Sequence, residues 1–136
     1  MKKQLTIAID FDGTIVEHKY PGIGKELPFA THTIKALHQK GHRLILWTYR
    51  SGKELEEALN FCKKHELEFY AVNKNYPEEK YNEQISRKIL ADLYIDDRNF
   101  GGMPDWTEIY QTLHPEEMVN NQTSEQKKWW KRNNNK

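Results

Sequence analysis

The stretch LTIAIDFDGT, residues 5–14, decides the fold of this chain. Its first half is an apolar, β-branched run, which is typical of a buried strand in a parallel sheet. Two carboxylates, Asp10 and Asp12, follow this run directly, and Gly13 and Thr14 complete the stretch. Acidic groups at the end of a buried strand lose hydration, and a bound cation is the usual compensation. The stretch therefore predicts a metal site at the carboxyl end of a buried strand.

Strand-like and helix-like patterns alternate after this stretch. They predict strands at residues 5–9, 43–48, 67–72 and 90–95, and helices at residues 29–39, 52–65 and 105–113. Ser51 is the expected N-cap of the second helix, with Glu54 completing a capping box, and Asp105 is the expected N-cap of the third. A fifth edge strand is the alternative for residues 105–113. The alternation indicates an α/β fold, in which right-handed crossovers join the strands of a doubly wound parallel sheet.

Length and composition narrow the class of protein. The 136 residues fit one domain, which we place at residues 1–115, and residues 116–136 form a polar, basic tail that we expect to be flexible. Lys and Arg number 21 against 20 Asp and Glu, so the overall charge does not favour nucleic acid or membrane surfaces. The single cysteine, Cys62, excludes an internal disulfide and a cysteine metal cluster. Without a membrane-length apolar run or a signal-peptide pattern, we expect a cytoplasmic protein.

The acids and a threonine at the strand ends converge in this topology. The carboxyl ends of parallel strands share one edge of the sheet, so Asp10 and Asp12 should meet Thr48 and the pair Asp96 and Asp97 there. Carboxylates without cysteine or histidine ligands favour a hard cation such as Mg²⁺. Adjacent residues of a regular strand point in opposite directions. We therefore expect one acid of the second pair to bind the metal and the other to orient a neighbouring group.

The same edge offers groups that suit an anion. Thr48 precedes a predicted helix, where a hydroxyl and free backbone amides form a phosphate cradle. Gly13 permits a tight turn and the close approach of a ligand. A cation is needed to neutralise the acids, and Lys88, shortly before the fourth strand, is our candidate. Arg87 and Lys74 are the alternatives.

These motifs resemble those of the haloacid dehalogenase (HAD) superfamily of phosphohydrolases. The resemblance rests on DFDGT at residues 10–14, LILWT at residues 44–48, Lys88, and YIDD at residues 94–97, in that order along residues 5–100. It implies a three-layer, Rossmann-like, HAD-like fold. The segments between Thr14 and Thr48, and between Thr48 and Lys88, are too short to hold the cap domain that many members carry. The chain therefore resembles a small capless member with an open site.

The resemblance also implies an activity and roles for the motif residues. It implies a Mg²⁺-dependent phosphatase that hydrolyses a phosphate monoester through an aspartyl-phosphate intermediate. Asp10 would be the nucleophile and Asp12 the general acid and base. Thr48 and Lys88 would hold the phosphoryl oxygens.

Metal ligands follow from the same resemblance, and candidate substrate contacts follow from positions in the chain close to the motifs and in the irregular segments. The metal would be held by Asp10, by the backbone carbonyl of Asp12, and by one of the acids that end the fourth strand. Motif register favours Asp97 over Asp96 for that ligand. Arg50, close after Thr48, and Gly13 are expected to contact the substrate. His18, Lys19, Tyr20 and Tyr76, in the irregular segments 17–28 and 73–84, are further candidates.

Two other functions remain as hypotheses. The first is a phosphate- or metal-binding module with little turnover. The second is a domain tethered to nucleic acid or protein through its tail, where Trp129 and Trp130 lie between basic residues. The sequence leaves open the class of phosphorylated substrate, and it also leaves open a homo-oligomer, which would close an open site.

Overall fold

The computed structural model of the chain describes residues 3–117. Its elements are, in order, β1 (Thr6–Ile9), α1 (Ala30–Gln39), β2 (Arg43–Leu46), α2 (Gly52–Lys64), β3 (Ala71–Val72), β4 (Leu93–Ile95) and α3 (Trp106–Leu113). The chain forms two compact units, Met1–Met103 and Pro104–Lys136, and all four strands belong to the first. The domain boundary expected near residue 115 stays a prediction, and the tryptophan pair of the tail lies outside the described residues.

The four strands form one parallel sheet in the order β3-β2-β1-β4. The predicted α/β fold is therefore confirmed. Ile9 at the end of β1 lies opposite Leu46 of β2 on one side and Ile95 of β4 on the other. Because the three strands end in register, the residues that follow them leave the sheet at one edge. The strand order also reverses between β1 and β4, and ligands commonly bind at such a point in α/β sheets.

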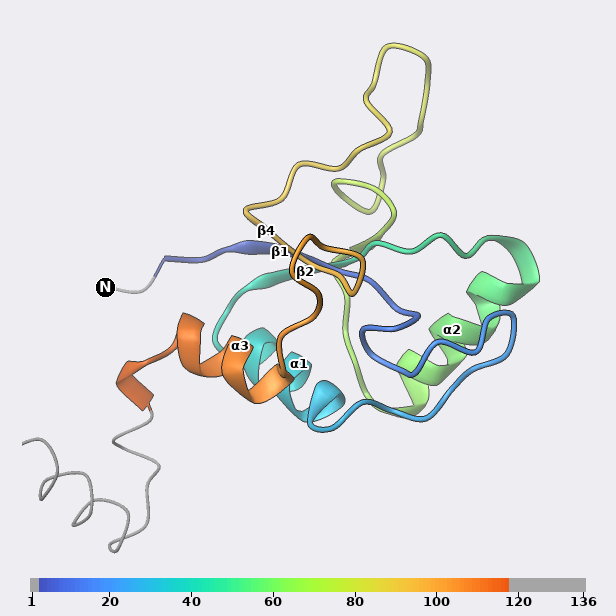
Figure 1. Ribbon diagram of the computed structural model, residues 1–136. Coiled ribbons are helices and arrows are strands. Elements are labelled where there is room, and N and C mark those ends of the chain that lie inside the picture. Colours follow the sequence, from blue (N-terminus) through green and yellow to red (C-terminus); the bar gives the residue numbers. More distant parts are fainter. Residues whose placement is uncertain (1–2, 118–136) are drawn as a thin grey trace, which may run out of the picture. The chain divides into compact units, whose positions relative to one another are not determined.

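The core forms where apolar strand residues meet the apolar stripes of the helices. Ile7, Ile9, Leu44 and Leu46 are each no more than 1% exposed. The residues that α1 buries recur at helical spacing, namely Ala30, Thr33, Ile34 and Leu37. In Figure 1, α1 and α2 lie on the same side of the strands, as right-handed crossovers in one direction require.

The connection from β3 to β4 differs from the other two crossovers. Residues 73–92, all of them described, contain no helix, and Figure 1 shows much of this segment extending away from the strands. Its end returns to the sheet, where Ile89 packs in a buried cluster with Ala8, Ile45 and Ala71. An irregular segment therefore supplies apolar cover where a doubly wound sheet usually has a helix.

Several predicted element boundaries are wrong, because hydrogen bonds to other parts of the chain replace strand pairing at these ends. β2 ends at Leu46, since the N–H of Thr48 donates to the Asn73 side chain. β4 starts at Leu93 instead of residue 90, because the N–H of Leu90 donates to the Asn75 side chain. β3 begins at Ala71, since the chain at Leu67 still bonds back to the end of α2.

The predicted helix caps are correct in position and wrong in bonding. Ser51 and Asp105 precede α2 and α3 in extended conformation, yet neither side chain makes a capping hydrogen bond. The capping box expected between Ser51 and Glu54 is therefore absent. α3 is a helix, so the alternative of a fifth strand is wrong. Over residues 3–117, no helix combines the length and apolar character needed to cross a bilayer.

Candidate active site

A cleft of about 580 Å³ opens where β1, β2 and β4 end. The predicted convergence of the strand ends is confirmed, because residues from all three ends line this cleft. The residues that line it are Asp10, Asp12, His18, Tyr20, Trp47, Thr48, Tyr49, Asp96, Asp97 and Arg98.

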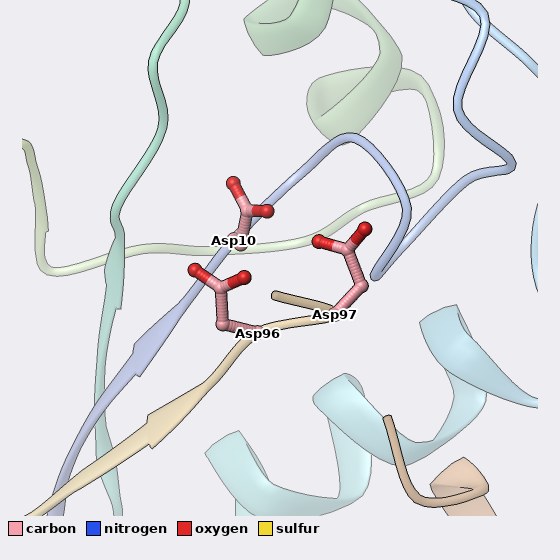
Figure 2. A group of neighbouring side chains, drawn as sticks. All are labelled: Asp10, Asp96 and Asp97. Atoms are coloured by element: carbon pink, nitrogen blue, oxygen red, sulfur yellow. The ribbon is translucent and has the colours of Figure 1, made fainter. Parts of the chain in front are cut away.

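Three carboxylates gather in this cleft, and we call Asp10, Asp96 and Asp97 the acid cluster. Each offers an oxygen that lies within 4.8 Å of the others, and Figure 2 shows the three carboxylates close together where β1 and β4 end. Both acids after β4 take part because regular strand geometry stops at Ile95. Like charges at this distance repel each other strongly in a partly buried site. Three hard oxygen donors are also the kind of ligand that Mg²⁺ prefers, so the residues present fit that ion.

Neighbouring groups hold the two acids that follow β4. The Thr14 hydroxyl accepts a hydrogen bond from the N–H of Asp97 at 3.1 Å and lies 3.5 Å from Asp97 Oδ1. Asp96 Oδ1 accepts from the N–H of Arg98 at 2.8 Å. A Cβ atom on Gly13 would collide with the Asp97 carboxylate, and the backbone there has a φ of 81°. Glycine at this position therefore allows the turn after β1 to approach Asp97.

The surroundings of Asp10 favour its protonated form. Burial is the main cause that raises the pKa of Asp10, from 3.8 to about 7. A backbone hydrogen bond from Phe11 lowers this pKa, while the charges of Asp96 and Asp97 raise it further. In the absence of a cation, Asp10 therefore holds a proton close to neutral pH.

Asp12 lies two residues beyond Asp10 and has a different environment. Arg50 binds its carboxylate with two hydrogen bonds, Nε to Oδ2 at 2.7 Å and Nη2 to Oδ1 at 2.8 Å. The side chains of this Arg50–Asp12 pair are 0% and 11% exposed. The bond to Asp12 is the main cause that raises the pKa of Arg50. Asp12 therefore has a cation from its own chain.

The remaining donors of Arg50 bind backbone carbonyls. Nη1 donates to Pro21 and Glu54, each at 3.1 Å, and Nη2 donates to Gly22 at 2.6 Å. All five N–H groups of the guanidinium are thereby used. Arg50 joins segment 17–28 and α2 to Asp12, and its contact with a substrate stays a prediction.

Thr48 lines the cleft as expected for a phosphate contact. Its hydroxyl oxygen accepts a hydrogen bond from the N–H of Arg50 at 3.0 Å, which leaves the hydroxyl proton available to a ligand.

The predicted cations lie elsewhere. Lys88 Nζ lies 5.2 Å from the centroid of the Tyr94 ring, and Lys74 Nζ donates to the carbonyl of Pro77. Neither residue, nor Arg87, lines the cleft. The role of Lys88 therefore stays a prediction.

Sequence reasoning missed Arg98 as a basic side chain of the cleft. Its Nε lies 3.9 Å from Asp97 Oδ2. The signal available in the sequence was its position directly after the second acidic pair. Tyr49 was also missed, and its place directly after Thr48 was the corresponding signal.

Comparison with solved structures shows a relative of this chain. No family model and no curated protein matches the chain. A structure described as that of the conserved protein coded by locus from Bacteroides thetaiotaomicron is similar at 57% sequence identity, with a TM-score of 0.79. The match covers 84% of this chain and 93% of that one. This chain belongs to the same family as that protein. The Bacteroides protein's description states no activity, so the relationship supports the fold and leaves the chemistry to the site.

Proposed function

We propose that this chain is a Mg²⁺-dependent phosphatase of the HAD type, with a capless, three-layer, Rossmann-like fold, that hydrolyses a phosphate monoester. The observation that carries the proposal is the acid cluster opening on a cleft that Asp12 and Thr48 also line. The order of the four motifs along the sequence is its second support. Mg²⁺ would be held by Asp10, Asp96 and Asp97, and it would neutralise charge on the acids and the phosphate.

The proposed reaction has two steps. In the first, a carboxylate oxygen of Asp10 attacks phosphorus, the ester P–O bond breaks, and Asp12 gives a proton to the leaving oxygen. In the second, water attacks the phosphorus of the aspartyl-phosphate and gives a proton to Asp12. The bond between phosphorus and Asp10 then breaks, which releases inorganic phosphate and restores the carboxylate.

The Arg50–Asp12 pair constrains this scheme. It orients the carboxylate beside the cleft, and an ionised carboxylate is the form that takes a proton from water in the second step. Both Asp12 oxygens accept hydrogen bonds from Arg50. Before the first step, one of these hydrogen bonds must therefore break so that the freed Asp12 oxygen can carry the proton that it donates.

The phosphoryl group has two proposed contacts. The Thr48 hydroxyl donates a hydrogen bond to one oxygen, and Arg98 supplies positive charge from the lining of the cleft. Lys88 is the alternative cation that the sequence motif suggests.

The experiment is phosphate release from p-nitrophenyl phosphate with and without Mg²⁺. We expect release that depends on Mg²⁺, and a loss of at least about 1000-fold in Asp10→Asn. Glu56→Gln, an exposed acid on α2, is the matched control and should keep wild-type activity. Full activity in Asp10→Asn would contradict the mechanism.

A second candidate function is a phosphate- or metal-binding module with little turnover. The observation that favours it is the engagement of both Asp12 oxygens by Arg50, which opposes the acid step. This candidate predicts that Mg²⁺ raises the melting temperature while no phosphate ester is hydrolysed. The tethering role of the tail falls on residues outside the described part of the chain.

A further inference from the structure

Ring-bearing side chains line the cleft beside the acids. They are His18, Tyr20, Trp47 and Tyr49, and we call them the aromatic rim. The rim comes from two places, since His18 and Tyr20 belong to segment 17–28 and Trp47 and Tyr49 follow β2. In each place, one residue separates the two ring residues. The two segments therefore both contribute a pair of rings to the lining of the cleft.

Contacts beneath the rim hold two of its rings. The Arg50 guanidinium carbon lies 5.1 Å from the centroid of the Tyr20 ring. Trp47 is half-buried and packs against the core cluster that contains Ile45. Since Arg50 and the core are fixed by the fold, these rings are set in place before any ligand arrives.

Tyr49 leaves most of its ring to solvent. It is 90% exposed, although it meets Tyr20 edge to face, with ring centroids 6.1 Å apart and planes at 70°. Tyr20 is 41% exposed. Neighbouring exposed ring faces at the lining of a cleft are suited to stacking on a planar group.

We propose that the aromatic rim binds a planar aromatic ring in the leaving group of the phosphate monoester. The inference rests on the proposed phosphatase function for the phosphate end, which the acid cluster and Thr48 would hold. A cleft of about 580 Å³ has the size of a small-molecule site, so it accommodates a leaving group beside the phosphate. The ring belongs either to a nucleobase, one sugar away from the phosphate, or to an aryl group close to it.

The test uses substrates that differ in the ring and share the ester chemistry. Adenosine 5′-monophosphate is compared with ribose 5-phosphate, and benzyl phosphate with cyclohexylmethyl phosphate, all with Mg²⁺. We expect kcat/KM to favour the ring-bearing member by about 10-fold, mainly through KM. If the nucleotide pair shows this preference, the ring of the leaving group is assigned as a nucleobase. If only the benzyl pair shows it, the ring is assigned as an aryl group. Equal kcat/KM within both pairs would overturn the inference while leaving the phosphatase proposal intact.

Variants test whether the rim causes the preference. Tyr49→Ala should reduce it to less than about threefold, and Tyr49→Phe should retain it, because stacking needs the ring and not the hydroxyl. Tyr81→Ala, at a tyrosine that is 53% exposed outside the cleft lining, is the matched control and should leave the preference unchanged. A preference that survives Tyr49→Ala would contradict the assignment.

Absence of hydrolysis would be a failure of the proposed function, and binding then tests the inference separately. Calorimetry of the Mg²⁺-loaded protein compares the Kd of adenosine 5′-monophosphate with that of ribose 5-phosphate, and does the same for the benzyl pair. Tighter binding of a ring-bearing member by about 10-fold supports the rim. Equal Kd values within both pairs overturn it.

Discussion

The acid cluster and the Arg50–Asp12 pair each contain one acid from the end of β1, and the charges of these two acids are balanced in different ways. Asp12 has a bidentate cation from its own chain, buried with it. Asp10 meets two further acids and has a pKa raised to about 7. The fold thus gives Asp12 a buried cation, whereas the acid cluster has only the exposed Arg98 beside it, 3.9 Å from Asp97. We therefore expect an added cation to bind at the acid cluster and not at Asp12.

The largest expected effect comes from removing the cation of the pair. Arg50→Met leaves Asp12 buried without its partner, so the free energy of unfolding should fall by about 3–5 kcal/mol. Urea unfolding measures this loss. Arg98→Met, at an exposed arginine beside the acid cluster, is the control and should change stability by less than about 0.5 kcal/mol. Equal losses in the two variants would show that the two regions do not differ in this way.

A smaller effect is expected where the turn after β1 meets the acid cluster. Gly13→Ala should destabilise by about 2–3 kcal/mol, because it adds a collision with Asp97 to backbone strain. Gly101→Ala has a similar positive φ of 96° and no heavy atom within 4 Å of the added Cβ, so it should cost only about 1 kcal/mol. Chemical denaturation compares the two variants, and a thermal shift with Mg²⁺ should be lost only in Gly13→Ala. Equal destabilisation would exclude the collision as the cause.

The smallest effect is a pH dependence of the metal-free protein. Folded Asp10 keeps its proton up to about pH 7, while the unfolded chain releases it near pH 4. The folded state thus binds more protons between these values, and its stability should fall as the pH rises through this window. We expect the ionisation of Asp10 to lower the free energy of unfolding by about 1–2 kcal/mol across this window, after solvent screening is allowed for. Urea unfolding in EDTA at several pH values measures it, and Asp10→Asn should lack this contribution. A wild-type slope equal to that of Asp10→Asn would contradict it.

The parts of the fold that were predictable from sequence are those indicated by patterns of neighbouring residues. An apolar run followed by acids marks β1 and the start of the cleft, and the same signal marks β4 and its acids. Parallel pairing then brings these ends together, because topology requires it. Element ends were less predictable, since side chains such as Asn73 and Asn75 bond to distant backbone and stop the strands.

The site was predictable in its acids and less so in its cations. Arg50 follows Thr48 closely enough to suggest a ligand contact, but its partner Asp12 is 38 positions away. Nothing local shows that five donors will be used within the chain. Lys88 precedes an acidic strand end in sequence, yet its side chain lies against Tyr94. Side-chain direction decides these roles, and sequence spacing does not specify it.

The contact between Thr14 and Asp97 has a consequence for assembly of the sheet. β4 is an edge strand of three residues, paired with β1 alone among the described strands. Thr14 and Asp97 are 83 positions apart in the chain, so their hydrogen bonds close a long loop at the place where little strand pairing holds β4. An ion bound by both Asp10 and Asp97 would link the ends of β1 and β4 at the same place. Metal content would then govern how firmly this edge strand is retained.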